Sequence, residues 1–270
     1  MKDEIHAIEV DGLLPFGYES TGDETWFTCR FDPEPTARRV FWFHKPETLA
    51  RMHDDHVEHR GGSLRARIQD IEPLTAAPEE VPHLRKAQHT AIRNLEASLK
   101  QNKPRALIQM ATGSGKTFAA TNICERLISQ GQAKRILFLV DRSNLGEQTL
   151  KEFQGFTVPG TGRKFTELYN VQHLSSNVID PVSSVCISTI QRAYSILRGD
   201  EELAPELDEA SGFDAAPERT QEVDYNPGLA IEDFDVIIID ECHRLAVRSG
   251  RTAEMEARRI VPGSSQAHPI

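Results

Sequence analysis

The stretch Ala106-Leu-Ile-Gln-Met-Ala-Thr-Gly-Ser-Gly-Lys-Thr117 decides how the rest of this 270-residue chain is interpreted. It begins with apolar residues typical of a buried strand and passes into a glycine-rich loop. Residues 116–129 then continue with the pattern of a helix. Glycine lets backbone N–H groups close around phosphate oxygens, and a helix N-terminus adds unpaired donors at the same place. The stretch therefore predicts a strand at 106–110, a phosphate-binding loop and a helix at 116–129.

Each residue of this loop has an expected role in holding a nucleotide. Lys116 is placed to reach the β- and γ-phosphates, and the Thr117 hydroxyl is placed to bind Mg²⁺. Four loop residues are expected to surround the phosphates, namely Thr112, Gly113, Ser114 and Gly115. The pattern G-x-x-x-x-G-K-[ST] starts with glycine where this chain has Met110, so the match is partial. The alternative is a glycine-rich turn with an incidental lysine.

A second motif, Phe234-Asp-Val-Ile-Ile-Ile-Asp-Glu-Cys-His243, joins an apolar strand to two acidic residues. Carboxylates at the C-terminal end of a parallel strand face the crevice where ligands bind in open α/β sheets. Asp240 is expected to hold the Mg²⁺ that Thr117 also serves, and Glu241 to orient or deprotonate an attacking water. For the pair alone an acidic helix cap is an equal alternative, but the phosphate loop favours the nucleotide site.

The segments around these motifs alternate between helix and strand. We expect further helices at 83–100, 144–153 and 191–197, and further strands at 135–140, 184–188 and 234–240. Strands of continuous Val, Ile and Leu that alternate with helices indicate a parallel sheet covered on both faces. The predicted fold class for residues 83–243 is therefore α/β.

The remaining segments have a different character. Residues 13–46 hold aromatic and β-branched runs bounded by Gly, Pro and Asp, which predicts a meander of short strands. A helix is expected to start at Pro46, and residues 61–82 are interpreted as a connector. Residues 199–228 are rich in Asp and Glu and predict a mobile acidic insertion. Residues 244–270 are expected to form a poorly ordered tail.

Charge is distributed unevenly along the chain. The net charge of −10 argues against a simple basic clamp for nucleic acid. Residues 81–198, however, carry a net +9 between flanks of −8 and −11. Arg142 and Arg192 follow expected strand ends in this basic segment, where they could contact DNA phosphates or simply solvate helix starts.

Composition disfavours several other classes of protein. The apolar runs are too short to cross a bilayer, and the first residues do not resemble a signal peptide. The four cysteines lie more than fifty residues apart, so neither a zinc site nor a disulfide framework is expected, and a reducing cytoplasm fits. His53, His56 and His59 recur every third residue, but a solvated charged helix face is favoured over a metal site.

Taken together, the motifs resemble those of superfamily 2 helicases and DNA translocases over residues 82–243, which implies a RecA-like domain. Leu84-Arg-Lys-Ala-Gln88 resembles the glutamine motif, which implies that Gln88 recognises adenine. Val140-Asp-Arg-Ser-Asn144 and Ser188-Thr-Ile-Gln191 resemble motifs that face DNA. They imply a set of DNA contacts, Arg142, Ser143, Thr189, Gln191 and Arg192. The resemblance also implies ATP and Mg²⁺ as cofactors and assigns His243 to coupling.

A narrower resemblance is to the R (motor) subunit of type I restriction endonucleases. It rests on the acidic insertion and on three segments, Leu137-Phe-Leu-Val-Asp-Arg-Ser-Asn-Leu145, Cys186-Ile-Ser-Thr-Ile-Gln-Arg192 and Phe234-Asp-Val-Ile-Ile-Ile-Asp-Glu-Cys-His-Arg244. Residues 1–60 are similar to the end of that subunit's nuclease domain, through Leu14-Pro-Phe-Gly-Tyr18 and Phe43-His-Lys-Pro46. This resemblance implies a bacterial cytoplasmic ATPase that moves double-stranded DNA to drive its cleavage. It also implies methyltransferase and specificity subunits as partners, and no membrane.

The chain also departs from that subunit. No metal-binding Asp and Glu-x-Lys precede residue 13, so we expect no DNA cleavage by this chain. Past Arg244 the resemblance stops, as a frameshift or truncation of the gene would explain, and neither a second RecA-like domain nor its arginine finger is found. One alternative is therefore a fragment that binds ATP–Mg²⁺ without turnover. Another phosphate-loop class, a GTPase or a small-molecule kinase, is a further alternative.

Overall fold

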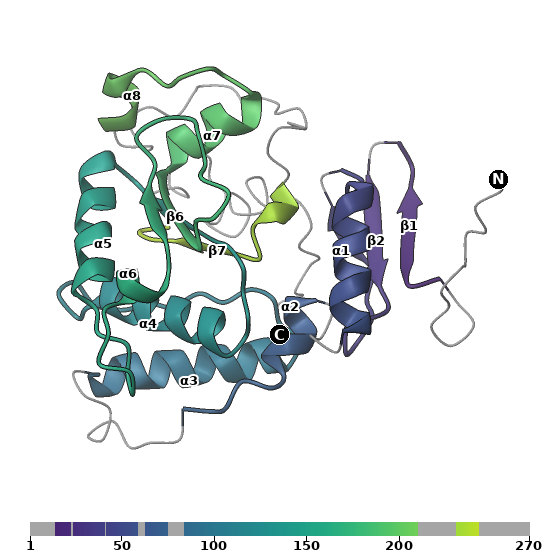
Figure 1. The fold of residues 1–270 in the computed structure, drawn as a ribbon, viewed down its shortest axis with the longest axis horizontal. Coiled ribbons are helices and arrows are strands. Elements are labelled where there is room, and N and C mark those ends of the chain that lie inside the picture. Colours follow the sequence, from purple (N-terminus) through teal and green to yellow (C-terminus); the bar gives the residue numbers. More distant parts are fainter. Residues whose placement is uncertain are drawn as a thin grey trace.

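The computed structural model describes residues 14–22, 24–40, 42–58, 63–74, 84–209 and 231–242. Two sheets organise them, as Figure 1 shows. The first is antiparallel and contains β1 (Phe16–Ser20), β2 (Thr25–Cys29) and β3 (Arg38–Val40) in that order. The second is parallel, in the order β5-β6-β4-β7, and contains β4 (Ile136–Val140), β5 (Val171–His173), β6 (Val185–Thr189) and β7 (Val236–Ile239).

The N-terminal sheet forms a small module with helix α1 (Pro46–Val57). Its core consists of Phe27, Cys29 and Phe31, against which Leu49 and Met52 of α1 pack. The predicted meander and the predicted helix start at Pro46 are both confirmed. The histidines of α1 have local partners, since His56 stacks on Phe31 and His53 Nδ1 lies 3.3 Å from Asp54 Oδ1.

The parallel sheet is buried between helices, which confirms the predicted α/β class. All residues of β4 and β6 are buried. Because side chains alternate along a strand, β4 contributes to two separate cores. Ile136, Phe138 and Val140 pack in the larger core with α3 (Lys86–Lys100), α4 (Lys116–Ser129) and α5 (Ser143–Gly155), whereas Leu137 and Leu139 pack on the other side with α7 (Ile190–Arg198).

The helix boundaries agree with the sequence predictions to within a few residues, and α4 has the predicted bounds. Four shorter elements complete the fold, α2 (Leu64–Ile68), α6 (Phe165–Leu168), α8 (Pro205–Glu209) and the 3₁₀ helix η1 (Ile231–Asp233). Helix α2 lies in the expected connector, and α8 lies in the expected acidic insertion, so neither segment is wholly irregular. Within the described ranges, no helix is long and apolar enough to cross a membrane.

The predicted strand at 106–110 is wrong. Residues 103–111 form neither helix nor strand, and Leu107 is 77% exposed. An apolar run becomes a strand only where a neighbouring strand supplies partners for its backbone groups. Among the described residues, none pairs with this segment, and β7 forms one edge of the parallel sheet. The loop that follows is therefore positioned by α3 and α4 instead of by a preceding strand.

Polar contacts connect the N-terminal module to one end of the parallel sheet. Lys134, just before β4, places its Nζ 2.7 Å from Asp55 Oδ2 of α1, and its backbone N–H donates to Asp235 Oδ2 at 2.6 Å. Asp235 immediately precedes β7. These contacts lie at the N-terminal ends of β4 and β7, opposite the ends that carry the candidate site.

Candidate functional site

The glycine-rich loop is shaped by two glycines with left-handed backbone conformations. Gly113 has φ 74° and Gly115 has φ 81°, a region that side chains with a Cβ rarely occupy. Ser114 closes the turn, because its N–H and its hydroxyl both donate to Ala111 O, at 3.2 and 2.6 Å. A Cβ on Gly113 would meet nothing, whereas a Cβ on Gly115 would overlap the Gln88 amide. The loop is thus turned toward solvent at Gly113 and held at Gly115.

Hydrogen bonds from the start of helix α3 hold the backbone of the glycine-rich loop in place. Gln88 is buried, and its Nε2 donates to Ser114 O at 3.1 Å and to Gly115 O at 3.0 Å. Its Oε1 accepts from the Arg85 N–H at 2.8 Å, and the Arg85 guanidinium donates to Gly113 O at 3.1 Å. The sequence assigned Gln88 to adenine, but the contact present in this structure is with the loop backbone. Arg85 was not predicted, although a cation three residues before Gln88 was visible in the sequence.

The loop lysine meets the acidic pair at the C-terminal end of β7. Lys116 Nζ lies 2.5 Å from Glu241 Oε1, although 125 residues separate them in sequence. Glu241 has φ 52°, an uncommon value for a residue with a Cβ, and its N–H donates to Asp240 Oδ1 at 2.9 Å. Asp240 continues the sheet through its N–H, which donates to Leu139 O at 2.9 Å. The two predicted motifs therefore form one half-buried site.

The donor set at this site suits a hard cation bound together with phosphate. Asp240 and Glu241 offer carboxylate oxygens and Thr117 offers a hydroxyl, which are oxygen ligands that Mg²⁺ accepts alongside water and phosphate. Within the described part of the chain, no group of three or more His, Cys, Asp and Glu side chains is arranged to hold a metal by itself. The residue types at this site thus fit Mg²⁺.

Cys242 follows the acidic pair. Burial raises the pKa of its thiol, and the negative charges of Asp240 and Glu241 raise the pKa further. Because the thiolate is the form that acts as nucleophile or metal ligand, this environment disfavours both roles for Cys242.

All five expected DNA contacts lie at the C-terminal edge of the sheet, and three of them are partly exposed. Arg142, with a side chain 42% exposed, and Ser143 follow β4, while the half-buried Gln191 follows β6. The expectation that Thr189 and Arg192 contact DNA stays a prediction. In this arrangement both residues are buried, and their polar atoms bind Asp208. The expected coupling residue, His243, lies outside the described residues.

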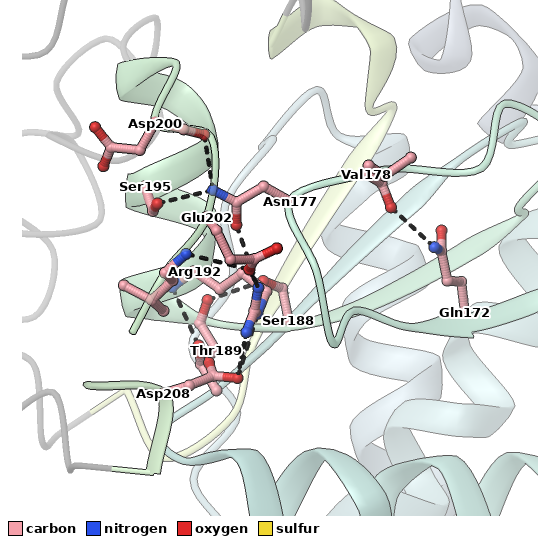
Figure 2. A network of polar contacts seen from close by, with 11 residues as sticks. Gln172, Asn177, Val178, Ser188, Thr189, Arg192, Ser195, Asp200, Glu202 and Asp208 are labelled. Atoms are coloured by element: carbon pink, nitrogen blue, oxygen red, sulfur yellow. Dashed lines mark hydrogen bonds and ion pairs between the residues drawn. The ribbon is translucent and has the colours of Figure 1, made fainter. Parts of the chain in front are cut away.

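The polar network that surrounds Arg192, which Figure 2 shows, was not predicted from the sequence. Its members come from the β5–β6 loop, from the β6–α7 junction and from residues 200–209. The only sequence signal was the acidic composition of the insertion, which does not indicate which carboxylate folds back onto which arginine.

A parallel sheet covered on both faces, with a glycine-rich loop whose lysine meets two carboxylates at a strand end, defines a helicase-like, RecA-like α/β domain. Residues 82–264 match the family described as "Type III restriction enzyme, res subunit", and the chain belongs to that family.

The curated relatives are described as endonuclease subunits of type I restriction enzymes. The type I restriction enzyme EcoKI endonuclease subunit of Escherichia coli (strain K12) is 29% identical over 242 residues, which is 86% of this chain and 18% of that protein. The EcoAI endonuclease subunit of Escherichia coli is 33% identical over 158 residues, 58% of this chain and 15% of that protein. The SauCOLORF180P endonuclease subunit of Staphylococcus aureus (strain COL) is 31% identical over 133 residues, 49% of this chain and 11% of that protein. The chain spans less than a fifth of the length of these relatives.

Proposed function

We propose that this chain is the ATP- and Mg²⁺-binding first motor domain of a type I restriction enzyme R subunit, a DNA-dependent ATPase that translocates duplex DNA. The observation that carries the proposal is the meeting of Lys116 with Glu241 beside the glycine-rich loop. The subunit description of the curated relatives supports the restriction role. In this proposal the partners are double-stranded DNA and the methyltransferase and specificity subunits of the complex.

Each residue of the site has a separate role in binding the nucleotide or in its hydrolysis. Lys116 exchanges its contact with Glu241 for the β- and γ-phosphate oxygens, as charge-assisted hydrogen bonds to phosphate favour. Glu241 is then released to orient a water and accept its proton. Thr117 and Asp240 would hold Mg²⁺, which would supply positive charge against the developing negative charge of the phosphates. Gln88 and Arg85 keep the loop backbone in place while these exchanges occur.

The DNA role rests on charge and on position. The segment 81–198 carries a net +9, and phosphate contacts by Lys and Arg dominate affinity for nucleic acid. Arg142, Ser143 and Gln191 lie at the same edge of the sheet as Glu241, since all four follow the C-terminal ends of parallel strands. A DNA strand bound across this edge would therefore lie beside the nucleotide.

The test is a steady-state ATPase assay with and without duplex DNA, together with titration of a fluorescent ATP analogue. We expect ATP to bind and GTP to compete weakly, with turnover that rises when DNA is added. Binding without DNA-stimulated turnover would favour the alternative of a nucleotide-binding fragment. Equal competition by GTP would contradict the motor proposal and favour another phosphate-loop class.

A further inference from the structure

The start of the acidic insertion folds back onto the end of β6. Arg192, in the first turn of α7, donates from Nη2 to Asp208 Oδ2 at 2.9 Å and from Nε to the same oxygen at 3.2 Å. Its Nη1 donates to Glu202 Oε1 at 2.7 Å. The Thr189 hydroxyl donates to Asp208 Oδ1, so one carboxylate engages both side chains, as Figure 2 shows.

Solvent is largely excluded from Arg192 and Asp208 in this network, but it reaches Glu202. The side chain of Arg192 is 4% exposed and that of Asp208 is 9% exposed, whereas the Glu202 side chain is 55% exposed. The hydrogen bond from Arg192 is the main cause that lowers the pKa of Glu202. One guanidinium therefore faces two acidic side chains, both supplied by residues 200–209.

Apolar burial does little to hold this segment down. Within residues 201–209 Asp208 is the only buried residue, Leu203 is half-buried, and Leu207 is 48% exposed. Asn177 adds a polar anchor, because its Nδ2 donates to Asp200 O and to Ser195 Oγ, both at 2.9 Å. Burial of apolar area normally fixes a segment in place, so a segment fixed by charges and hydrogen bonds is open to competition by another anion.

Residues 200–209 cover the Arg192 guanidinium and the Thr189 hydroxyl, two kinds of group that can also bind a phosphodiester. A guanidinium fork and a hydroxyl match phosphate oxygens as well as carboxylate oxygens. They also lie at the sheet edge where Arg142 and Ser143 follow the neighbouring strand β4. The carboxylates of Asp208 and Glu202 thus occupy positions in which DNA phosphates would find the same donors.

We propose that residues 200–209 act as an internal phosphate mimic, in which Asp208 and Glu202 close a DNA-backbone site made by Thr189 and Arg192. DNA opens the site by competing for these two side chains. The inference rests on the proposed DNA-motor function and adds a regulatory contact to it. It also explains why two residues of an expected DNA-facing motif are buried in the chain without DNA.

The test compares two double variants for affinity to duplex DNA at fixed salt. Glu202→Gln with Asp208→Asn removes the mimic's charges, and Glu201→Gln with Glu206→Gln removes the same charge from exposed positions of the same segment. We expect the first variant to bind DNA about tenfold more tightly than the second, because it also frees the covered site. Adding Arg192→Ala to the first variant should abolish that gain.

Three controls keep the outcome interpretable. Thermal unfolding checks that the variants fold, and Glu202→Gln alone, at a half-exposed position, retains the buried Asp208 contact and should give a smaller gain. Equal affinity of the two double variants, or weaker binding by the first together with a lower melting temperature, would overturn the mimic and assign the network a structural role. Binding of a fluorescent ATP analogue should be equal in all variants, and its absence in the wild type would count against the motor proposal independently.

Discussion

Two cation–carboxylate contacts at the same edge of the parallel sheet differ in how they are enclosed. Lys116 and Glu241 have side chains 31% and 23% exposed, whereas Arg192 and Asp208 have side chains 4% and 9% exposed. A half-exposed pair is weak and readily exchanges partners, while a buried pair is costly to break because it leaves an uncompensated charge. The first contact therefore suits a site that a small ligand enters directly, whereas the second opens only if an incoming anion takes the place of the Asp208 carboxylate beside Arg192.

The largest expected effect on stability comes from breaking the buried contact. Arg192→Ala leaves Asp208 buried without its guanidinium, which should lower the free energy of unfolding by about 3 kcal/mol. Lys116→Ala, at the exposed contact, should lower it by less than about 1 kcal/mol. Chemical denaturation of both variants followed by circular dichroism measures the difference. Equal decreases in the free energy of unfolding would contradict the proposed difference between the two contacts.

The loop glycines offer a matched pair of smaller changes. Gly115→Ala forces a Cβ into the Gln88 amide at φ 81°, and we expect it to cost about 2 kcal/mol and to weaken nucleotide binding. Gly113→Ala meets no neighbour at φ 74° and should cost about 1 kcal/mol. Thermal unfolding with and without an ATP analogue measures the effects of the two variants on stability and on nucleotide binding. A smaller effect of Gly115→Ala than of Gly113→Ala would contradict the contact between Gln88 and the loop at Gly115.

Acid should loosen the N-terminal module, because this module holds a buried histidine in its neutral form. Burial lowers the pKa of His44 to about 4, and Tyr18 OH lies 2.6 Å from His44 Nδ1. The folded state thus favours neutral His44, so its stabilising contribution is complete above pH 6.5 and declines as the pH falls from 6.5 toward 4. Both tryptophans, Trp26 and Trp42, belong to this region, so tryptophan fluorescence reports its unfolding.

His44→Gln serves as the control for this pH dependence. It removes the titrating group at the same place, so the melting temperature followed by tryptophan fluorescence should change less between pH 7 and pH 5 than in the wild type. An identical pH profile in the variant would assign the acid sensitivity to other groups.

The smallest expected effect is on binding by Glu241→Gln. The variant keeps the shape of the side chain and loses the carboxylate, so nucleotide affinity should change by less than about threefold while turnover is lost. Analogue titration and ATPase assays measure the two quantities separately. A large loss of affinity would contradict the role of Glu241 as a group that acts on water.

The sequence predicted those features that depend on local pattern. Continuous apolar runs predicted β4, β6 and β7, and helical spacing predicted α4. Because ligands bind at the C-terminal ends of parallel strands, the sequence also predicted that Lys116 and Glu241 share one site. Features that depend on distant partners were missed. Residues 106–110 have strand composition, but no strand within the described residues pairs with them. No local pattern indicates that Asp208 returns to Arg192 or that Gln88 supports the loop.

The most direct test of the central claim is titration of a fluorescent ATP analogue, with Mg²⁺, against the wild-type chain and Lys116→Ala. The proposal predicts saturable binding by the wild type and an affinity at least about a hundredfold lower in the variant, because the charge that faces the phosphates is lost. Circular dichroism spectra of the two proteins should superimpose. Equal affinities would contradict the assignment of the loop and its acidic partners as a nucleotide site.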